Sequence, residues 1–264
     1  MTVIDSGSTG NQCTVENSPP TEAVPPAGKG PRPHRQVWAI ALLAGVVAGL
    51  GAWLAGELLH EFFQPEVFKV KVALLTFIQP TAASLNAAEF KNAMLVFTVL
   101  GGVLGLVMGV AGGFAVRSRA HGLAVGLAGL IAGGLAGAGA SWGLLPLFFR
   151  RVVPDPNDLL TPILIHAGIW TAIGAVGGGA FGLGTRSGRR VIDAFVGAGF
   201  GAFLATLVFY GLSEAFFPDS AAMVLVPTSA GVRLLAFFLI TMLTACGAAR
   251  GAIGRVSRAA SAAQ

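Results

Sequence analysis

The chain has 264 residues, of which 54% are hydrophobic and only 11% are charged. A soluble domain carries about 25% charged residues, so this composition excludes a water-soluble globular protein. The sequence instead predicts one all-α integral membrane domain that follows a polar N-terminal segment.

Residues 1–36 form this segment, which we expect to be a disordered, proline-rich cytoplasmic tail. It is polar, and its six prolines lie between Pro19 and Pro33. Such a stretch cannot bury enough apolar surface to offset the entropy that is lost on ordering. No apolar core begins near Met1, so we expect no cleavable signal peptide and an uncleaved first helix.

Six apolar runs follow, and each is long enough to cross a bilayer as a helix. About 20 helical residues span a hydrocarbon core about 30 Å thick. Backbone polar groups must be paired within lipid, and these runs are too long and too uniformly apolar for the strands of a barrel. The predicted membrane domain covers residues 37–256, with helices at Val37–Leu59, Ala93–Val116, Gly122–Leu145, Pro162–Gly184, Ala194–Leu212 and Leu234–Ile253.

Local signals refine this layout. Thr161 before Pro162 predicts an N-cap with proline in the first turn, and Ser229 is a candidate cap for the last helix.

Residues 67–92 are expected to form an extended external loop. Within it, apolar and basic residues alternate over Phe68–Val72, which suits a short surface strand or an interfacial segment. The loop is a candidate contact for another membrane protein or an extracytoplasmic protein.

The basic residues are divided unevenly between the two ends of the predicted helices. The side that holds both termini carries eleven basic and four acidic residues, whereas the other side carries six basic and eight acidic residues. The positive-inside rule therefore places both termini in the cytoplasm. We expect the membrane to be the plasma (cytoplasmic) membrane. Membrane lipids are the expected partner of these arginines, and nucleic acid is not.

Recurring landmarks indicate that one helical hairpin is written three times. Each odd-numbered helix leaves the membrane through two phenylalanines, and each even-numbered helix ends in glycines and an arginine–serine pair. The predicted repeats are residues 37–121, 122–190 and 191–260, and they point the same way. An ordinary aromatic belt with short basic turns is the alternative. The landmarks are Phe62-Phe63, Phe148-Phe149 and Phe216-Phe217 at one end, and Arg117-Ser118, Arg186-Ser187 and Ser257-Arg258 at the other.

Glycines spaced four apart recur on the predicted helices. The longest series is Gly101, Gly105, Gly109 and Gly113. Lipid provides no hydrophobic drive for helix association, so close backbone approach and dispersion must supply it. We therefore expect glycine-rich (GxxxG) faces, arranged as a glycine zipper, to pack the helices within the chain.

The middles of the six predicted helices contain no Asp, Glu, Lys or Arg. Charged groups in a membrane core mark ion and proton paths, so an ion-coupled transporter is disfavoured. A passive pore for small neutral solutes stays open, because glycines and backbone carbonyls can line one. The four histidines are scattered, and we predict neither a metal site nor a cofactor site.

Ser141 and His166 are the candidate catalytic pair. Ser141 lies in a G-x-S-x-G pattern, near the outer end of the third predicted helix, and His166 lies near the outer start of the fourth. A similar depth would allow a hydrogen bond between nucleophile and base. The pair resembles that of the rhomboid intramembrane serine proteases, which also have a six-helix core, and the resemblance implies hydrolysis within the membrane. Rhomboids place serine and histidine on their fourth and sixth helices, and the alternative makes Ser141 a packing residue and His166 an interfacial one.

The sequence thus leads to three hypotheses for function. The first is a structural or accessory membrane protein without chemistry of its own. The second is a passive small-solute channel or transporter, and the third is an intramembrane serine hydrolase that uses Ser141 and His166. The match to rhomboids covers only a few residues and departs from their helix placement, which favours a protein that is not an enzyme.

Overall fold

The computed structural model describes residues 34–59, 61–72, 75–149, 160–217, 225–227 and 229–253. These residues include six helices that are long and apolar enough to cross a membrane, which confirms the predicted multi-pass helical membrane protein. The predicted tail lies outside the described residues except for positions 34–36, which open the first helix. Ser257 and Arg258 also lie outside them. The elements are α1 (His34–Leu58), β1 (Val67–Val72), β2 (Leu75–Pro80), α2 (Ala82–Ala115), α3 (Arg119–Phe149), α4 (Leu160–Gly184), α5 (Gly188–Phe216) and α6 (Ala230–Ile253).

The connection between the first two helices differs most from the prediction. Strands β1 and β2 form an antiparallel hairpin in which Val67 lies opposite Pro80. Of the two predictions for Phe68–Val72, a short strand or an interfacial segment, the strand is the one observed. Helix α2 begins at Ala82 rather than at Ala93, so the extended loop to residue 92 was wrong. The reason is a cap, because the Thr81 side chain accepts a hydrogen bond from the Ser84 N–H at 3.2 Å.

Two predicted helix starts had opposite outcomes. Helix α4 begins at Leu160, so Thr161 lies inside the first turn and is not the cap. The first N–H groups of a helix have no acceptor within it, so Pro162, which has no N–H, is tolerated in the first turn beside Thr161. Ser229 directly precedes α6, and its carbonyl accepts the N–H of Arg233 at 3.0 Å, as expected of a residue at the cap position.

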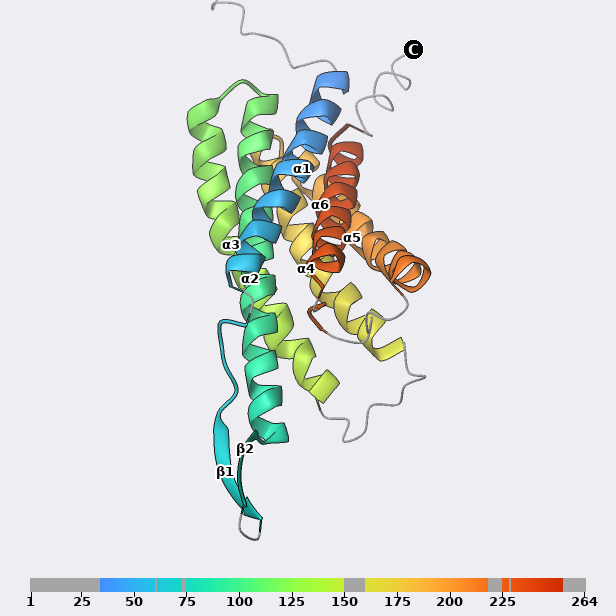
Figure 1. Ribbon diagram of the computed structural model, residues 1–264. Coiled ribbons are helices and arrows are strands. Elements are labelled where there is room, and N and C mark those ends of the chain that lie inside the picture. The colour runs from blue at the N-terminus through green and yellow to red at the C-terminus, as the bar shows by residue number, and fades with distance from the viewer. Residues whose placement is uncertain are drawn as a thin grey trace, which may run out of the picture. The chain divides into compact units, whose positions relative to one another are not determined.

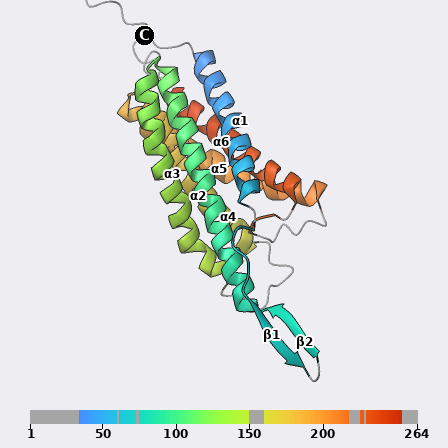
Figure 2. The ribbon, with the colours of Figure 1, turned by 60° about the vertical axis from the view of Figure 1, so that its left-hand side comes forward.

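The helices alternate in direction, so the bundle has two ends (Figure 1). We call the end with turns 116–118 and 185–187 the basic end, and the opposite one the hairpin end. Strands β1 and β2 project from the hairpin end, past the start of α2, in both ribbon views (Figure 2). Helix α2 has 34 residues and is therefore about 50 Å long, which exceeds a hydrocarbon core of about 30 Å.

Neighbouring helices approach one another closely at glycines. Helix α2 packs most extensively against α3, and α5 packs extensively against both α4 and α6. A Cβ atom added to Gly105 of α2 would overlap the backbone of Gly129 in α3. The same overlap would arise between α5 and α6, where the Gly197 and Gly247 backbones meet. It would also arise between α2 and α4, at Gly112 and Gly184.

The apolar residues divide into a packed core and an outward face. Leu104, Ile173 and Phe181 are completely buried in the core between α2 and α4. Helices α3 and α5 instead expose many large apolar side chains, which suits contact with lipid chains. The exposed members include Leu123, Leu127, Ile131 and Leu135 on α3, and Ile192, Val196 and Phe200 on α5.

Candidate functional site

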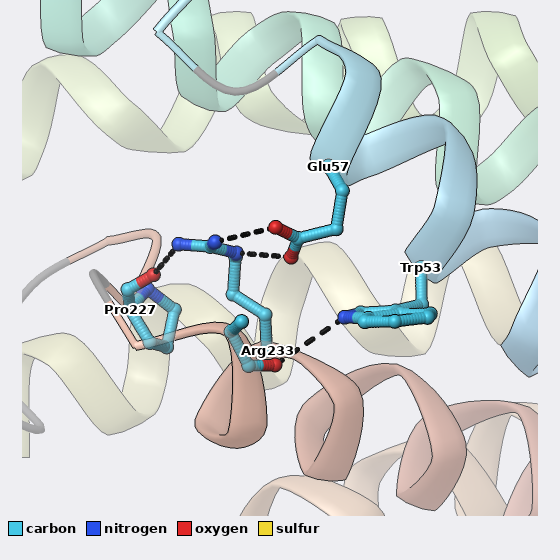
Figure 3. A network of polar contacts seen from close by, with 5 residues as sticks. Trp53, Glu57, Pro227 and Arg233 are labelled. Carbon is cyan, nitrogen blue, oxygen red and sulfur yellow. Dashed lines mark hydrogen bonds and ion pairs between the residues drawn. The ribbon is translucent and has the colours of Figure 1, made fainter.

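Buried polar side chains gather at the hairpin end of the bundle. Arg233 of α6 donates from Nε to Glu57 Oε1 of α1 at 2.7 Å, and from Nη2 to Glu57 Oε2 at 2.8 Å. Its Nη1 donates to the Pro227 carbonyl at 2.7 Å, so the guanidinium bridges a carboxylate and a backbone oxygen (Figure 3). Trp53 of α1 adds a second link, because its Nε1 donates to the Ala230 carbonyl at 3.3 Å.

The position of this ion pair explains why lipid tolerates it. The Arg233 side chain is only 6% exposed and the Glu57 side chain is 28% exposed. A buried guanidinium is acceptable only where its donors are engaged, and here Nε, Nη1 and Nη2 each have an oxygen partner. Both residues also lie in a terminal turn of their helices, away from the span centres. The pair therefore ties α1 to α6 without placing a charge at the middle of the membrane.

His166 is the second buried polar centre at this end. Its Nε2 lies 2.9 Å from the Leu225 carbonyl, and its Nδ1 lies 2.9 Å from the Tyr210 hydroxyl and 3.0 Å from the Pro162 carbonyl. The neutral tautomer with the proton on Nε2 satisfies two of these contacts, because Nε2–H then donates to Leu225 and Tyr210 O–H donates to Nδ1. The rings of Phe97, Trp170 and Tyr210 surround the imidazole at centroid distances of 5.7–5.9 Å.

The two polar centres hold one short segment, residues 225–227, against the bundle. His166 hydrogen bonds to the Leu225 carbonyl and Arg233 to the Pro227 carbonyl, while the Leu225 side chain is buried at 1% exposure. A small cavity lies against this segment, between α2, α4, α5 and α6. It offers about 10 Å³ for the centre of a water molecule, which is about the size of one water, and its exposed wall is apolar. The segment and the cavity together form a small, aromatic-lined pocket at this end of the bundle.

The structure does not bring Ser141 and His166 into a hydrogen bond. Ser141 is completely buried on α3, and its Oγ has no hydrogen-bond partner among the described residues. Both ring nitrogens of His166 are occupied by the partners given above. The nucleophile–base contact that hydrolysis requires is therefore not formed in this arrangement. Three other buried polar atoms in the described part lack partners, namely Trp170 Nε1, Ser213 Oγ and Thr244 Oγ1.

Sequence reasoning missed the partners of these groups, although two signals were visible. Tyr210 is the only tyrosine of the chain, and it lies within an apolar predicted span. Glu57 and Arg233 are single opposite charges near the same end of two predicted spans. The carbonyls of Leu225 and Pro227 carried no signal, because any residue supplies a carbonyl and only the path of the chain decides which one is used.

Within the described ranges, no three His, Cys, Asp or Glu side chains lie close enough together to hold a metal ion. Comparison of the chain with protein-family models, curated proteins and solved structures gives no match.

Proposed function

We propose that this protein is an accessory membrane protein without chemistry of its own, which presents the β1–β2 hairpin to a partner protein. The observation that carries the proposal is the position of the hairpin, which projects beyond the bundle in both ribbon views (Figures 1 and 2). The partner is an extracytoplasmic protein or the external part of another membrane protein.

A two-stranded sheet that projects from its bundle favours binding of another strand. An isolated hairpin is marginally stable in water and gains stability when a further strand pairs with it. Each strand of this hairpin is an edge strand, which is a template for backbone pairing. At its base, Val67 and Phe68 expose about half of their surface. A partner strand would therefore find both unpaired backbone groups and apolar side chains.

The base of the hairpin is fixed, as a docking element requires. The Ser84 hydroxyl donates to the Glu66 carbonyl at 2.9 Å, which ties the start of β1 to the first turn of α2. Asn92 bonds both backbone groups of Phe63, accepting from its N–H at 2.9 Å and donating to its carbonyl at 3.0 Å. The direction of the hairpin relative to α2 is thus held by three side-chain bonds, so little entropy is lost when a partner binds.

The interior favours this role over the two alternatives. The cavity at the hairpin end accommodates about one water molecule and has an apolar wall, which does not suit a continuous path for a polar solute. The candidate nucleophile Ser141 is buried and lacks the hydrogen bond to His166 that would activate it.

A photo-crosslinking experiment tests the proposal. A benzophenone amino acid at Phe68, in intact membranes, is expected to give one discrete protein adduct. The matched control is the same probe at Phe216, which is exposed at the hairpin end but lies on α5. The purified adduct protein should then bind the wild-type chain and not a variant in which residues 67–80 are replaced by a glycine–serine linker. Equal adducts at both positions, or equal binding by the linker variant, would contradict the proposal.

A passive conduit is the second candidate, and the side-chain bonds that hold residues 225–227 are the observation that favours it. These residues line the cavity and are held by bonds from His166 and Arg233, so a conformational change that releases them would widen a cavity that is too small for a solute in this arrangement. An Arg233→Ala variant in liposomes would then pass small neutral solutes that the wild type excludes. Equal solute entry for both proteins would exclude this function.

The proposed architecture is three hairpins, at about residues 37–121, 122–190 and 191–260, packed through glycine faces in a plasma membrane with both termini cytoplasmic. Two features support it: the turns at Arg117 and Arg186 share a left-handed backbone (φ 60° and 58°), and glycine backbones meet at several helix contacts. Arg186 also bonds Ser118, so the two turns are compared in a Ser118→Ala background. If the turns are copies, Arg117→Gly and Arg186→Gly should each raise stability there by up to about 1 kcal/mol. Unequal effects in that background would oppose the repeat. Reporter fusions at each terminus would test the orientation.

A further inference from the structure

The two turns at the basic end are built in the same way. Arg117 and Arg186 each adopt a left-handed conformation and each precede a serine. In both turns the arginine N–H donates to the carbonyl three residues earlier, to Phe114 at 3.1 Å and to Leu183 at 3.0 Å. The two arginines therefore occupy equivalent positions in two equivalent turns.

These turns are also joined to each other. Arg186 Nη2 donates to the Ser118 hydroxyl at 3.2 Å, across the gap between the turns. His121 Nε2 lies at hydrogen-bond distance, 3.2 Å, from the Leu183 carbonyl. Gly112 of α2 and Gly184 of α4 come shortly before the two turns in the chain, and their contact brings the backbones of these helices together. The basic residues of both turns thus belong to one continuous surface.

That surface is strongly positive. Residues 112–122 and 182–192 contain no acidic residue, and Asp193 is the one acid that follows directly on α5. The two segments contain five arginines. Four of them are exposed, and Arg190 is partly exposed. Guanidinium groups match phosphate oxygens in geometry and are weakly hydrated, which suits them to headgroups of phospholipids. The five are Arg117, Arg119, Arg186, Arg189 and Arg190.

We propose that the paired turns, residues 116–121 and 185–190, form one binding surface for the headgroup of an anionic phospholipid. A membrane lipid is favoured over a soluble anion because the exposed apolar face of α3 begins at Leu123, directly below the turns, and offers a surface for the acyl chains. The bond that Arg186 donates to the Ser118 hydroxyl orients the guanidinium between the two turns, so the surface acts as a unit. This inference is independent of the hairpin partner, because it concerns the other end of the bundle.

The test is thermal unfolding of the purified full chain in mixed micelles. Phosphatidylglycerol should raise the unfolding midpoint and phosphatidylcholine should not. Arg186→Gln should need at least fivefold more phosphatidylglycerol for half of the shift. Ser118→Ala should need about twofold more although its charge is unchanged. The control Arg250→Gln removes one exposed charge from the same end, on α6, and should respond as the wild type does.

Several results would overturn this inference. An equal loss in Arg186→Gln and Arg250→Gln would show general charge attraction rather than a built surface. A wild-type response of Ser118→Ala would show that the two turns act separately. A midpoint shift of the same size with inorganic phosphate would identify a soluble-anion site instead. Midpoints measured in phosphatidylcholine confirm that each variant is folded before the comparison is made.

Discussion

Replacing Glu57 by Gln removes the charge that neutralises Arg233 and keeps the size of the side chain. Arg233 is 6% exposed, and it would keep its bond to the Pro227 carbonyl at 2.7 Å and one of its two bonds to residue 57, because the glutamine oxygen still accepts. Removal of one partner of a buried ion pair costs about 3–5 kcal/mol. Since the Glu57 side chain is 28% exposed, water can partly replace its carboxylate, and we expect the lower end of this range, about 3 kcal/mol.

The assay is unfolding of the purified protein in a fixed detergent, followed by fluorescence. Glu214→Gln is the matched control, because this exposed glutamate lies at the same end of the bundle on α5, and its loss should change stability by less than about 0.5 kcal/mol. A double variant, Glu57→Gln with Arg233→Met, removes both charges and should recover most of the lost stability. Equal unfolding midpoints for Glu57→Gln and Glu214→Gln would refute the view that this pair holds α1 to α6.

Two further predictions concern the helix contacts and the histidine centre. Gly105→Ala should destabilise the protein by about 1–3 kcal/mol, because the new Cβ would meet the Gly129 backbone. The control Gly139→Ala places its Cβ in open space and should be neutral or slightly stabilising in the same unfolding assay. Tyr210→Phe removes the hydroxyl that bonds His166 Nδ1 and should cost about 1 kcal/mol; an unchanged midpoint would mean that this contact adds nothing.

The helices were predictable because the membrane imposes a simple rule on the sequence. Each span must be apolar for about 20 residues, and the six predicted runs all lie on observed helices. The prediction of Ala93 as the start of α2 was wrong because the preceding turns carry Glu89 and Lys91, which end the apolar run but not the helix. Hydropathy locates the part of a helix that lies in lipid, and a capping residue such as Thr81 locates its end.

The candidate site was less predictable, since its bonds join residues far apart in the chain. His166 was identified as a polar group in a span, but its partners come from α5 and from the segment before α6. Ser141 was chosen because of a local pattern, and a pattern of small residues does not distinguish a nucleophile from a packing position. The buried pair of Glu57 and Arg233 could have been suggested from these two charges alone, whereas the carbonyl of Leu225 could not.

The two ends of the bundle are closed by different interactions, and this difference says where the protein can change shape. At the basic end the helices α2, α3, α4 and α5 meet backbone to backbone at glycines, through contacts that leave no room for adjustment. At the hairpin end residues 225–227 are held by side-chain hydrogen bonds from His166 and Arg233, beside a small cavity. Side-chain bonds can exchange with water one at a time, whereas a packed backbone contact is lost only when the helices separate. Any opening that accompanies binding of a partner at β1–β2 should therefore start at the hairpin end, and hydrogen exchange should be faster at the amides of Leu225 and Val226 than at turns 116–118 and 185–187.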